Sequence, residues 1–139
     1  MRKSFRLEVA APDREILSTD VSAITVPGAG GEFGVWARHE PLVSALKPGA
    51  FTVVENGERR LYFVSGGFIE VTPVSATVLV EEFEPVEDID AEREEKNRKH
   101  ATEKMAKSKD AVEKEAAHAA RRRAEARLLA VQKSKEPFR

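Results

Sequence analysis

The stretch that decides the fold reads Val26-Pro-Gly-Ala-Gly-Gly-Glu-Phe-Gly-Val-Trp-Ala-Arg-His-Glu-Pro-Leu-Val-Ser-Ala-Leu-Lys-Pro-Gly49. It holds five of the eight glycines of the chain and three of its seven prolines. Glycine reaches backbone angles that strain other residues, and proline fixes its own φ and removes a hydrogen-bond donor. We therefore expect a compact, turn-rich corner between strands, which holds the Glu32 carboxylate and the His39 imidazole.

On both sides of this stretch the chain has the two-residue period of β-strands. Phe5, Leu7 and Val9 alternate with charged residues, as in a half-buried strand. Asn56-Gly57 is the clearest hairpin signal, because this pair accepts the positive φ angles of a tight primed turn. Many short strands separated by turns, without a helical period, predict an antiparallel β-sandwich or barrel of about ten strands. The other expected strands are 16–17, 21–26, 51–55, 59–64, 68–72 and 76–83.

The composition changes near Pro85, which restricts the residue before it to extended conformations and so ends the sheet. Residues 1–87 contain 8 Lys and Arg against 13 Asp and Glu, a net charge of −5. Residues 88–139 contain 15 against 11, a net charge of +4, and only one of the nine aromatic residues. The sequence therefore predicts an α+β protein, with a β-sandwich domain over residues 1–86 and a helical domain over residues 87–139.

The helical domain is expected to be a two-helix antiparallel hairpin. Asp88 or Asp90 can cap a first helix, and Asp110 with Glu113 has the spacing of a capping box for a second. Ser108-Lys109 contains neither glycine nor proline, so one continuous helix is the alternative. A narrow face of the second helix allows close packing but buries little apolar surface. Its residues are Ala117, Ala120, Ala124, Leu128 and Val131.

Several classes of protein are disfavoured. The chain has no cysteine, which excludes disulfides and thiolate metal sites. No apolar run approaches the roughly 20 residues that span a bilayer, and the first residues lack the apolar core of a signal peptide. We expect a soluble protein that meets a membrane only through a partner.

The glycines and histidines do not indicate chemistry either. The glycines of residues 28–34 lack the spacing, the lysine and the hydroxyl of a phosphate-binding loop, and no catalytic constellation is present. His39 is separated by sequence from His100 and His118, which lie in the helical segment, so no metal site is expected.

Three blocks of the sequence carry a resemblance. The first is Gly31-Glu-Phe-Gly-Val35 with His39-Glu-Pro-Leu-Val-Ser-Ala-Leu-Lys-Pro-Gly49, the second is Val64-Ser-Gly-Gly-Phe-Ile-Glu-Val71, and the third is Ile89-Asp-Ala-Glu-Arg93. Together, in this order, they resemble the epsilon subunit of bacterial and chloroplast F-type ATP synthases. The resemblance covers nearly the whole chain and implies the same sandwich and helical hairpin.

The resemblance also implies a function. The protein would be a non-catalytic subunit of the rotor stalk, which binds the gamma subunit and the ring of c subunits. Its helices would reach the alpha and beta subunits of the catalytic head and restrain ATP hydrolysis. Its place would be peripheral, on the cytoplasmic side of the bacterial inner membrane, and it would require no cofactor.

The resemblance places an interface with the c-ring and the gamma subunit at Gly31, Glu32, Gly34, His39 and Pro41. Glu32 matches the acid of the family that meets the polar loop of the c subunits, and an exposed ion pair there contributes about 0–1 kcal/mol. His39 and Pro41 match the His-x-Pro of the family. A solvated loop glutamate and a structural histidine are the alternative interpretations.

The resemblance further implies a regulatory ATP site. Asp90, Arg93, Arg123 and Arg127 match residues with which some bacterial epsilon subunits hold ATP between the folded helices. Arginines that share a helical face can bind phosphate in bidentate fashion. Glu94 departs from the alanine of the family signature, and a carboxylate beside an anionic ligand is unfavourable.

The arginines of the second helix have a second implied role. Arg121, Arg122, Arg123 and Arg127 are expected to contact an acidic segment of the beta subunit when the helices extend, and the alternative is a solvated basic face. The rival interpretation of the whole chain is a free-standing β-sandwich binding module, with a basic helical tail for an acidic partner or nucleic acid. Nucleic acid is disfavoured because the net charge is −1 and no aromatic residue lies among the arginines.

Overall fold

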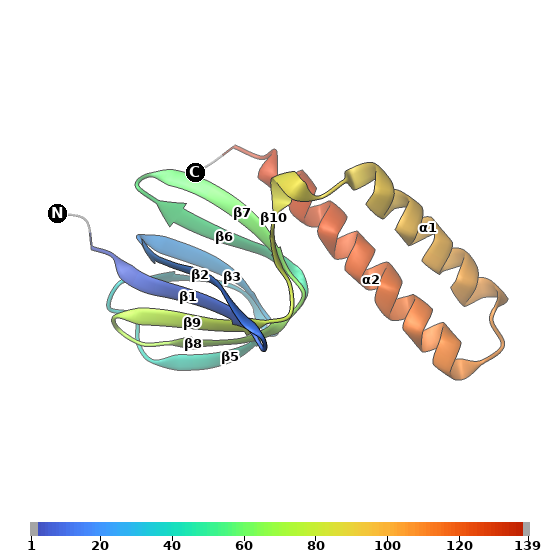
Figure 1. Cartoon of the computed structure of the whole chain (residues 1–139), viewed down its shortest axis with the longest axis horizontal. Helices are drawn as coiled ribbons and strands as arrows, with labels where there is room; N and C mark the ends of the chain where they lie inside the picture. The colour runs from blue at the N-terminus through green and yellow to red at the C-terminus, as the bar shows by residue number, and fades with distance from the viewer. Residues whose placement is uncertain (1–2, 138–139) are drawn as a thin grey trace.

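The computed structural model describes residues 3–137 and has a β-sandwich followed by two helices (Figure 1). This confirms the predicted α+β class and the number of strands. The strands are β1 (Phe5–Ala11), β2 (Arg14–Val21), β3 (Ala23–Gly28), β4 (Gly31–Trp36), β5 (Leu42–Leu46), β6 (Gly49–Glu55), β7 (Glu58–Val64), β8 (Gly67–Val71), β9 (Ser75–Val80) and β10 (Phe83–Pro85). A short 3-10 helix η1 (Val86–Asp88) leads to α1 (Ala91–Lys107) and α2 (Ala111–Ser134).

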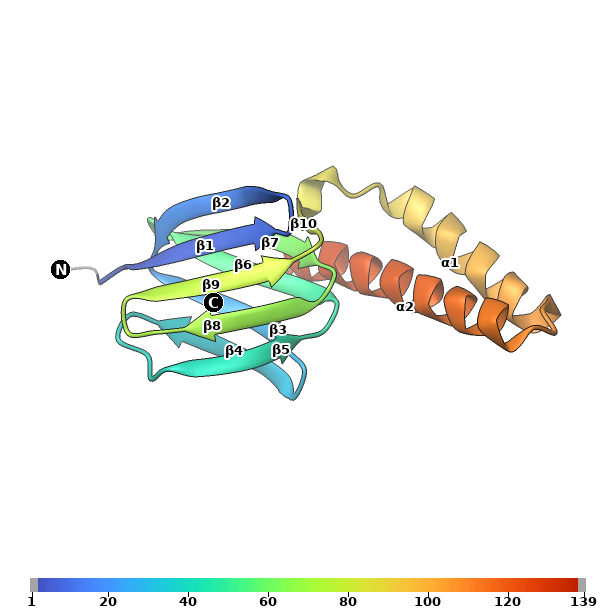
Figure 2. The same cartoon turned by 60° about the horizontal axis from the view of Figure 1, so that its bottom comes forward.

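The strands pair in the order β10-β7-β6-β3-β5-β8-β9-β1-β2, with β4 on β3. Neighbours are antiparallel except β1 and β9, which run parallel. The two layers of the sandwich meet where Gly28 of β3 pairs with Leu46 of β5. Figure 2 shows β5, β8, β9 and β1 in front of β3, β6 and β7. Each layer therefore has an inner face toward the core and an outer face away from it.

The core between the layers follows the alternation of the sequence. Phe5, Leu7 and Val9 of β1 are buried, and the charged residues between them are exposed. Phe51 and Phe83 meet edge to face, with ring centroids 5.3 Å apart. Burying a side chain of this size stabilises the fold by about 1.5–3 kcal/mol. The sandwich therefore has an apolar core of its own.

The prediction of one compact corner over residues 26–49 is wrong, because this stretch contains the two strands β4 and β5. Within β4, the Trp36 side chain lies over Gly34. A Cβ atom at position 34 would come within 2.7 Å of the indole ring, so the strand has a glycine there. Gly31 has a φ of 134°, which only glycine adopts without strain. Most of the glycines thus shape a strand and its turn, which composition alone does not distinguish from a loop.

Two turns test the local predictions. Asn56 and Gly57 have φ angles of 53° and 81°, which confirms the primed turn between β6 and β7. Arg38 has a φ of 66°, in the left-handed region that favours glycine. Its N–H donates to the Pro73 carbonyl oxygen at 2.8 Å, which anchors the loop between β4 and β5.

The helices form a hairpin and not one continuous helix. Asp90 caps α1, since its side chain accepts a hydrogen bond from the Arg93 N–H. Asp110 caps α2 by accepting from the Val112 N–H at 3.0 Å. The predicted capping box is wrong in one respect, because Glu113 accepts from the Ser108 hydroxyl at 3.0 Å. That hydroxyl in turn accepts from the Asp110 N–H, so Ser108 takes part in ending one helix and starting the next.

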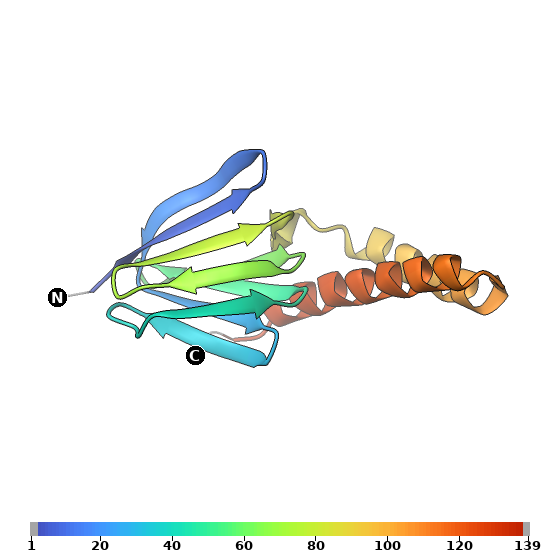
Figure 3. The same ribbon diagram turned by 90° about the horizontal axis from the view of Figure 1, so that it is seen from below.

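The C-terminal half of α2 packs on the outer face of β6 and β7, and the rest of the hairpin projects beyond the sandwich (Figures 1 and 3). The predicted alanine face is partly wrong, since Ala120 is exposed while Arg127 and Ala130 are buried. The apolar cluster under α2 comprises Leu61, Phe63, Val86, Ile89 and Ala130. No helix among residues 3–137 is long and apolar enough to cross a membrane.

Candidate functional site

Glu32 stands at the tip of the β3–β4 hairpin. The two-residue turn Ala29-Gly30 separates the strands, and Gly28 pairs with Gly31 just before Glu32. The Glu32 side chain is 53% exposed and forms an ion pair with Lys133 of α2. The expected interface acid thus stands at the tip of a tight hairpin, and it already has a basic partner within the chain.

His39 and Pro41 lie at the other end of β4. Four residue steps from Glu32 to Trp36 cover about 13 Å along the strand, and His39 follows in the loop beyond. His39 is half-buried, and its Nδ1–H donates to the Glu40 carbonyl oxygen at 2.6 Å. The structure therefore divides the expected interface residues between two ends of one strand.

An apolar row crosses the outer face of the layer formed by β5, β8, β9 and β1. One cross-strand row runs from Ala45 to Phe68, then to Leu79, then to Ala10. Phe68 is 59% exposed and Leu79 is 55% exposed. Large exposed apolar patches on soluble proteins mark interaction sites. Composition and period did not reveal this surface, because a strand that faces a partner has the same alternation as one that faces water.

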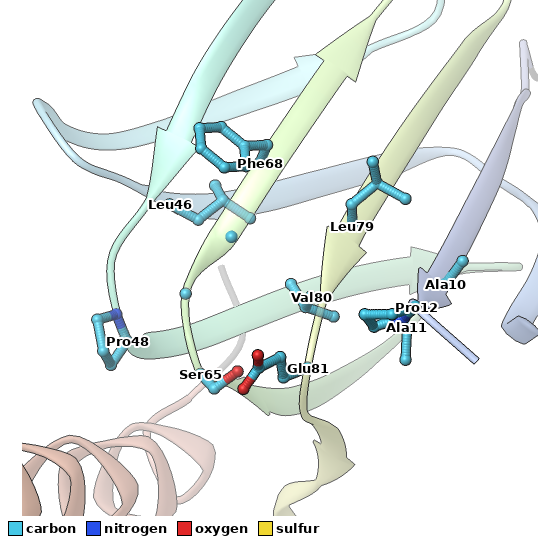
Figure 4. A pocket seen from close by; sticks show the side chains of 12 residues that line it. Ala10, Ala11, Pro12, Leu46, Pro48, Ser65, Phe68, Leu79, Val80 and Glu81 are labelled. Carbon is cyan, nitrogen blue, oxygen red and sulfur yellow. The ribbon is translucent and has the colours of Figure 1, made fainter. Parts of the chain in front are cut away.

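A groove continues this apolar row toward the end of the strands, as Figure 4 shows. It has a volume of about 530 Å³. Gly67 forms part of its wall with a φ of 143°, and a Cβ atom there would come within 2.1 Å of the Leu79 carbonyl oxygen. The absence of a Cβ atom at Gly67 is what lets β8 lie this close to β9 in the wall.

Arg127 is the centre of a charged cluster between the helices and the sandwich. Its side chain is only 10% exposed. The guanidinium donates to both carboxylate oxygens of Glu84, at 3.0 and 2.8 Å, and to Glu82 at 3.4 Å. Its Nε lies 3.3 Å from a carboxylate oxygen of Glu94 on α1, without the angle of a hydrogen bond. Arg123 adds a second cation, since its Nε donates to Glu82 at 2.9 Å.

The four residues expected to hold ATP are only partly brought together. Arg123 and Arg127 share Glu82, whereas Asp90 is used to cap α1 and Arg93 is exposed. A groove of about 340 Å³ lies between the helices, and Glu94, His100 and Arg123 are among its lining residues. Arg123 lines this groove and Arg127 does not, and both arginines are already paired with carboxylates.

The four arginines expected to meet the beta subunit do not form one face. Arg121 pairs with Glu125 at 3.2 Å and Arg122 with Glu115 at 3.6 Å, along the surface of α2. Arg123 and Arg127 instead pair with Glu82, which precedes β10, and Arg127 also pairs with Glu84 of β10. Exposed pairs such as the first two contribute little to stability, so Arg121 and Arg122 can change partners at low cost.

Two side chains near the end of the sheet, Glu87 and Tyr62, have shifted pKa values. The Glu87 carboxylate accepts from its own backbone N–H and from Arg60, at 3.1 Å, and these bonds hold the pKa of Glu87 below its usual range. Burial raises the pKa of Tyr62, whose ring stacks on Phe83 at a centroid distance of 4.4 Å. Residues 3–137 contain no cluster of three or more acidic or histidine side chains that could hold a metal ion.

The comparisons with known proteins identify the family. Residues 4–86 match the family described as ATP synthase, Delta/Epsilon chain, beta-sandwich domain. The chain is 43% identical over 128 residues to the ATP synthase epsilon chain of Nitratidesulfovibrio vulgaris (strain DP4), which covers 92% of this chain and 96% of that one. The chain belongs to the ATP synthase epsilon chain family. A second epsilon chain, from Maricaulis maris, is 36% identical and covers 86% of this chain and 90% of its own length.

Solved structures agree with the family. A chain in the Euglena gracilis mitochondrial ATP synthase, described as OSCP/F1/c-ring in rotational state 1, superposes with a TM-score of 0.81. It is 32% identical and covers 88% of this epsilon chain and 78% of its own length. A chain of the Tetrahymena thermophila central stalk and c-ring shares the fold, with a TM-score of 0.61 at 14% identity.

The sequence predictions for this epsilon chain missed three residues that hold its helices. Glu82 and Glu84 bind the arginines of α2, and Lys133 binds Glu32. The one signal for these pairs in the sequence was the charge division of −5 and +4 between the two parts of the chain, which indicates mutual attraction without naming the pairs.

Proposed function

We propose that this epsilon chain is a non-catalytic subunit of the rotor stalk, which couples the c-ring and the gamma subunit to the catalytic head. The observation that carries the proposal is the asymmetry of the sandwich. The outer face of β6 and β7 is covered by α2, whereas the opposite outer face leaves Phe68 and Leu79 exposed. A surface of this kind fits a permanent partner within an assembly.

The gamma subunit is the partner for the apolar row of Ala45, Phe68, Leu79 and Ala10. This apolar row with the adjoining groove suits a protein surface of matching shape. The c-ring is the partner for Glu32, because a carboxylate at the tip of a hairpin can reach a basic loop. Through these two contacts the chain would sit peripherally at the cytoplasmic side of the bacterial inner membrane.

The helices are the inhibitory element of the proposal. They are held by a small apolar cluster and by ion pairs, which are weaker and more easily exchanged than a large apolar interface. Release of α2 would free Arg123 and Arg127 from Glu82 and Glu84. Together with Arg121 and Arg122, these arginines would then face an acidic segment of the beta subunit and restrain ATP hydrolysis.

Regulation by ATP is also part of the proposal, although the arginines that would bind it are already paired with carboxylates. The groove between α1 and α2 offers space beside Arg123. A triphosphate must displace Glu82 and Glu84 from the arginines, and Glu94 places a third carboxylate at the same cation. We therefore expect ATP to bind weakly to this chain in its docked form, in which α2 packs on β6 and β7.

The test of the inhibitory role is the ATPase rate of the reconstituted complex, with the full chain and with a chain ending at Val86. The proposal predicts faster hydrolysis with the shortened chain, at equal incorporation of the two forms. Equal rates would remove the inhibitory role from residues 87–139.

A further inference from the structure

The ion pair between Lys133 and Glu32 joins the two parts of the chain that the proposed function uses separately. Glu32 is the acid displayed for the c-ring, and Lys133 belongs to the last turn of α2. The two residues are 101 positions apart, and both side chains are partly exposed, at 53% and 32%. The same carboxylate therefore serves an internal contact in the docked form.

Lys133 reaches Glu32 only because the end of α2 is docked. Ala130, one turn earlier, is 1% exposed in the apolar cluster with Leu61 and Phe63. Just after the helix, Arg59 of β7 donates to the Glu136 carbonyl oxygen at 2.7 Å. If α2 leaves the sandwich, Lys133 leaves with it and Glu32 loses this partner.

We propose that Glu32 is a shared contact, for which Lys133 of α2 and a basic loop of the c-ring compete. The inference rests on the c-ring contact in the proposed function and adds a coupling to it. A basic loop that takes Glu32 must displace Lys133 or share the carboxylate with it, which weakens the docking of α2. By linkage, docking of α2 weakens binding of the loop by the same factor.

The expected size of the coupling follows from the exposure of the pair. Ion pairs with this degree of solvent exposure change an equilibrium constant by up to about fivefold. The coupling therefore biases the position of the helices without determining it alone. The cluster around Arg127, which lies nearer the middle of α2, holds the helix independently of Glu32.

The test uses the full chain and the detergent-solubilised c-ring as the probe, with the dissociation constant as readout. Lys133→Gln is expected to tighten binding about two- to fivefold, because the internal competitor is removed. Lys135→Gln is the matched control. It removes the same charge two residues further along, and among residues 3–137 the Lys135 side chain has no ion pair, whereas Lys133 pairs with Glu32. Glu32→Gln is expected to weaken binding, and in that background Lys133→Gln should have no further effect.

A second readout is the amide exchange of residues 126–134, which the c-ring should accelerate in the parent chain and not in Glu32→Gln. If Glu32→Gln weakens binding while Lys133→Gln behaves as Lys135→Gln does, the coupling is overturned and the c-ring contact stands. The coupling is likewise overturned if the c-ring leaves the exchange of residues 126–134 unchanged in the parent chain. If Glu32→Gln binds as tightly as the parent, the c-ring contact itself is refuted, and the coupling with it.

Discussion

Arg127 of α2 donates two hydrogen bonds to the carboxylate of Glu84 in β10, at 3.0 and 2.8 Å, across 43 residues of sequence. The same guanidinium lies over the Phe63 ring at 5.0 Å. It therefore joins the helical hairpin to the sandwich through charge, hydrogen bonding and aromatic contact at one point. The inhibitory role proposed for the helices depends on how readily this point opens.

Arg127→Ala should release α2 from the sandwich. Removal of the cation leaves Glu84 and Glu94 without their arginine, in a site that is largely shielded from water, and leaves Glu82 paired with Arg123 alone. Breaking a buried pair costs about 3–5 kcal/mol, and since two of these acids are about one-third exposed we expect about 2–4 kcal/mol. The measurement is the opening free energy of α2 from amide hydrogen exchange.

The matched control for this change is Arg122→Ala, five residues earlier on the exposed surface of α2. Its pair with Glu115 spans 3.6 Å in solvent, so the opening free energy should change by less than about 0.5 kcal/mol. Equal protection of α2 in Arg127→Ala and in the parent chain would show that the cluster does not hold the helix.

Glu94→Ala should increase the affinity for ATP. The substitution restores the alanine of the family signature and removes one carboxylate from beside Arg127. Like charges at close range in a partly buried site repel by more than about 1 kcal/mol, so the gain should be on the order of tenfold. Calorimetry of the full chain measures it, with Glu92→Ala as the control on the exposed side of α1. Absence of binding at millimolar ATP in both Glu94→Ala and the parent would reject the nucleotide site.

Phe68→Glu should weaken binding to the gamma subunit. The ring stands at the centre of the exposed apolar row, and a carboxylate there would have to be desolvated against an apolar partner. We expect a loss of at least about tenfold in affinity with little change in folding stability. Val112→Glu is the control, because Val112 is also an exposed apolar residue but lies on α2. Unchanged affinity in Phe68→Glu would place the gamma subunit on another surface.

Alkaline pH should destabilise the sandwich through Tyr62. Burial is the largest cause that raises its pKa, and Glu87 and Glu55 add to it, while Arg60 opposes it. The unfolded chain loses the hydroxyl proton first, near pH 10, so the stability contribution is complete below about pH 10 and is lost as the pH rises above it. Because Tyr62 is the only tyrosine, tyrosinate absorbance follows this one group. A midpoint in the native chain at or below that in denaturant would contradict the prediction.

The parts of the fold that were predicted correctly depend on local chemistry. The Asn56-Gly57 turn, the alternation in β1 and the caps Asp90 and Asp110 each require only neighbouring residues. Strand β4 was missed because glycines usually indicate a turn. The reason for a glycine in this strand is a tertiary contact, in which the Trp36 ring lies over Gly34. The position of this ring cannot be predicted from the neighbouring residues in the sequence.

The candidate site was less predictable for the same reason. The resemblance supplied Glu32, Arg123 and Arg127, but their partners lie 33 to 101 residues away along the chain. The charge division agrees with the attraction seen between the two parts of the chain, yet it does not distinguish Glu82 and Glu84 from the other acids of the sandwich. Pairing of this kind is set by which face of α2 packs against β6 and β7, and a mostly polar helix does not indicate that face in its sequence.

The central claim is that this chain is a stalk subunit of an ATP synthase. Its most direct test is co-purification of a tagged full-length chain from detergent-solubilised membranes of its own source. The account predicts that alpha, beta and gamma subunits and the c-ring are recovered with the tagged chain. A tagged chain that purifies without these subunits would contradict it, and would favour a free-standing sandwich with a basic helical tail.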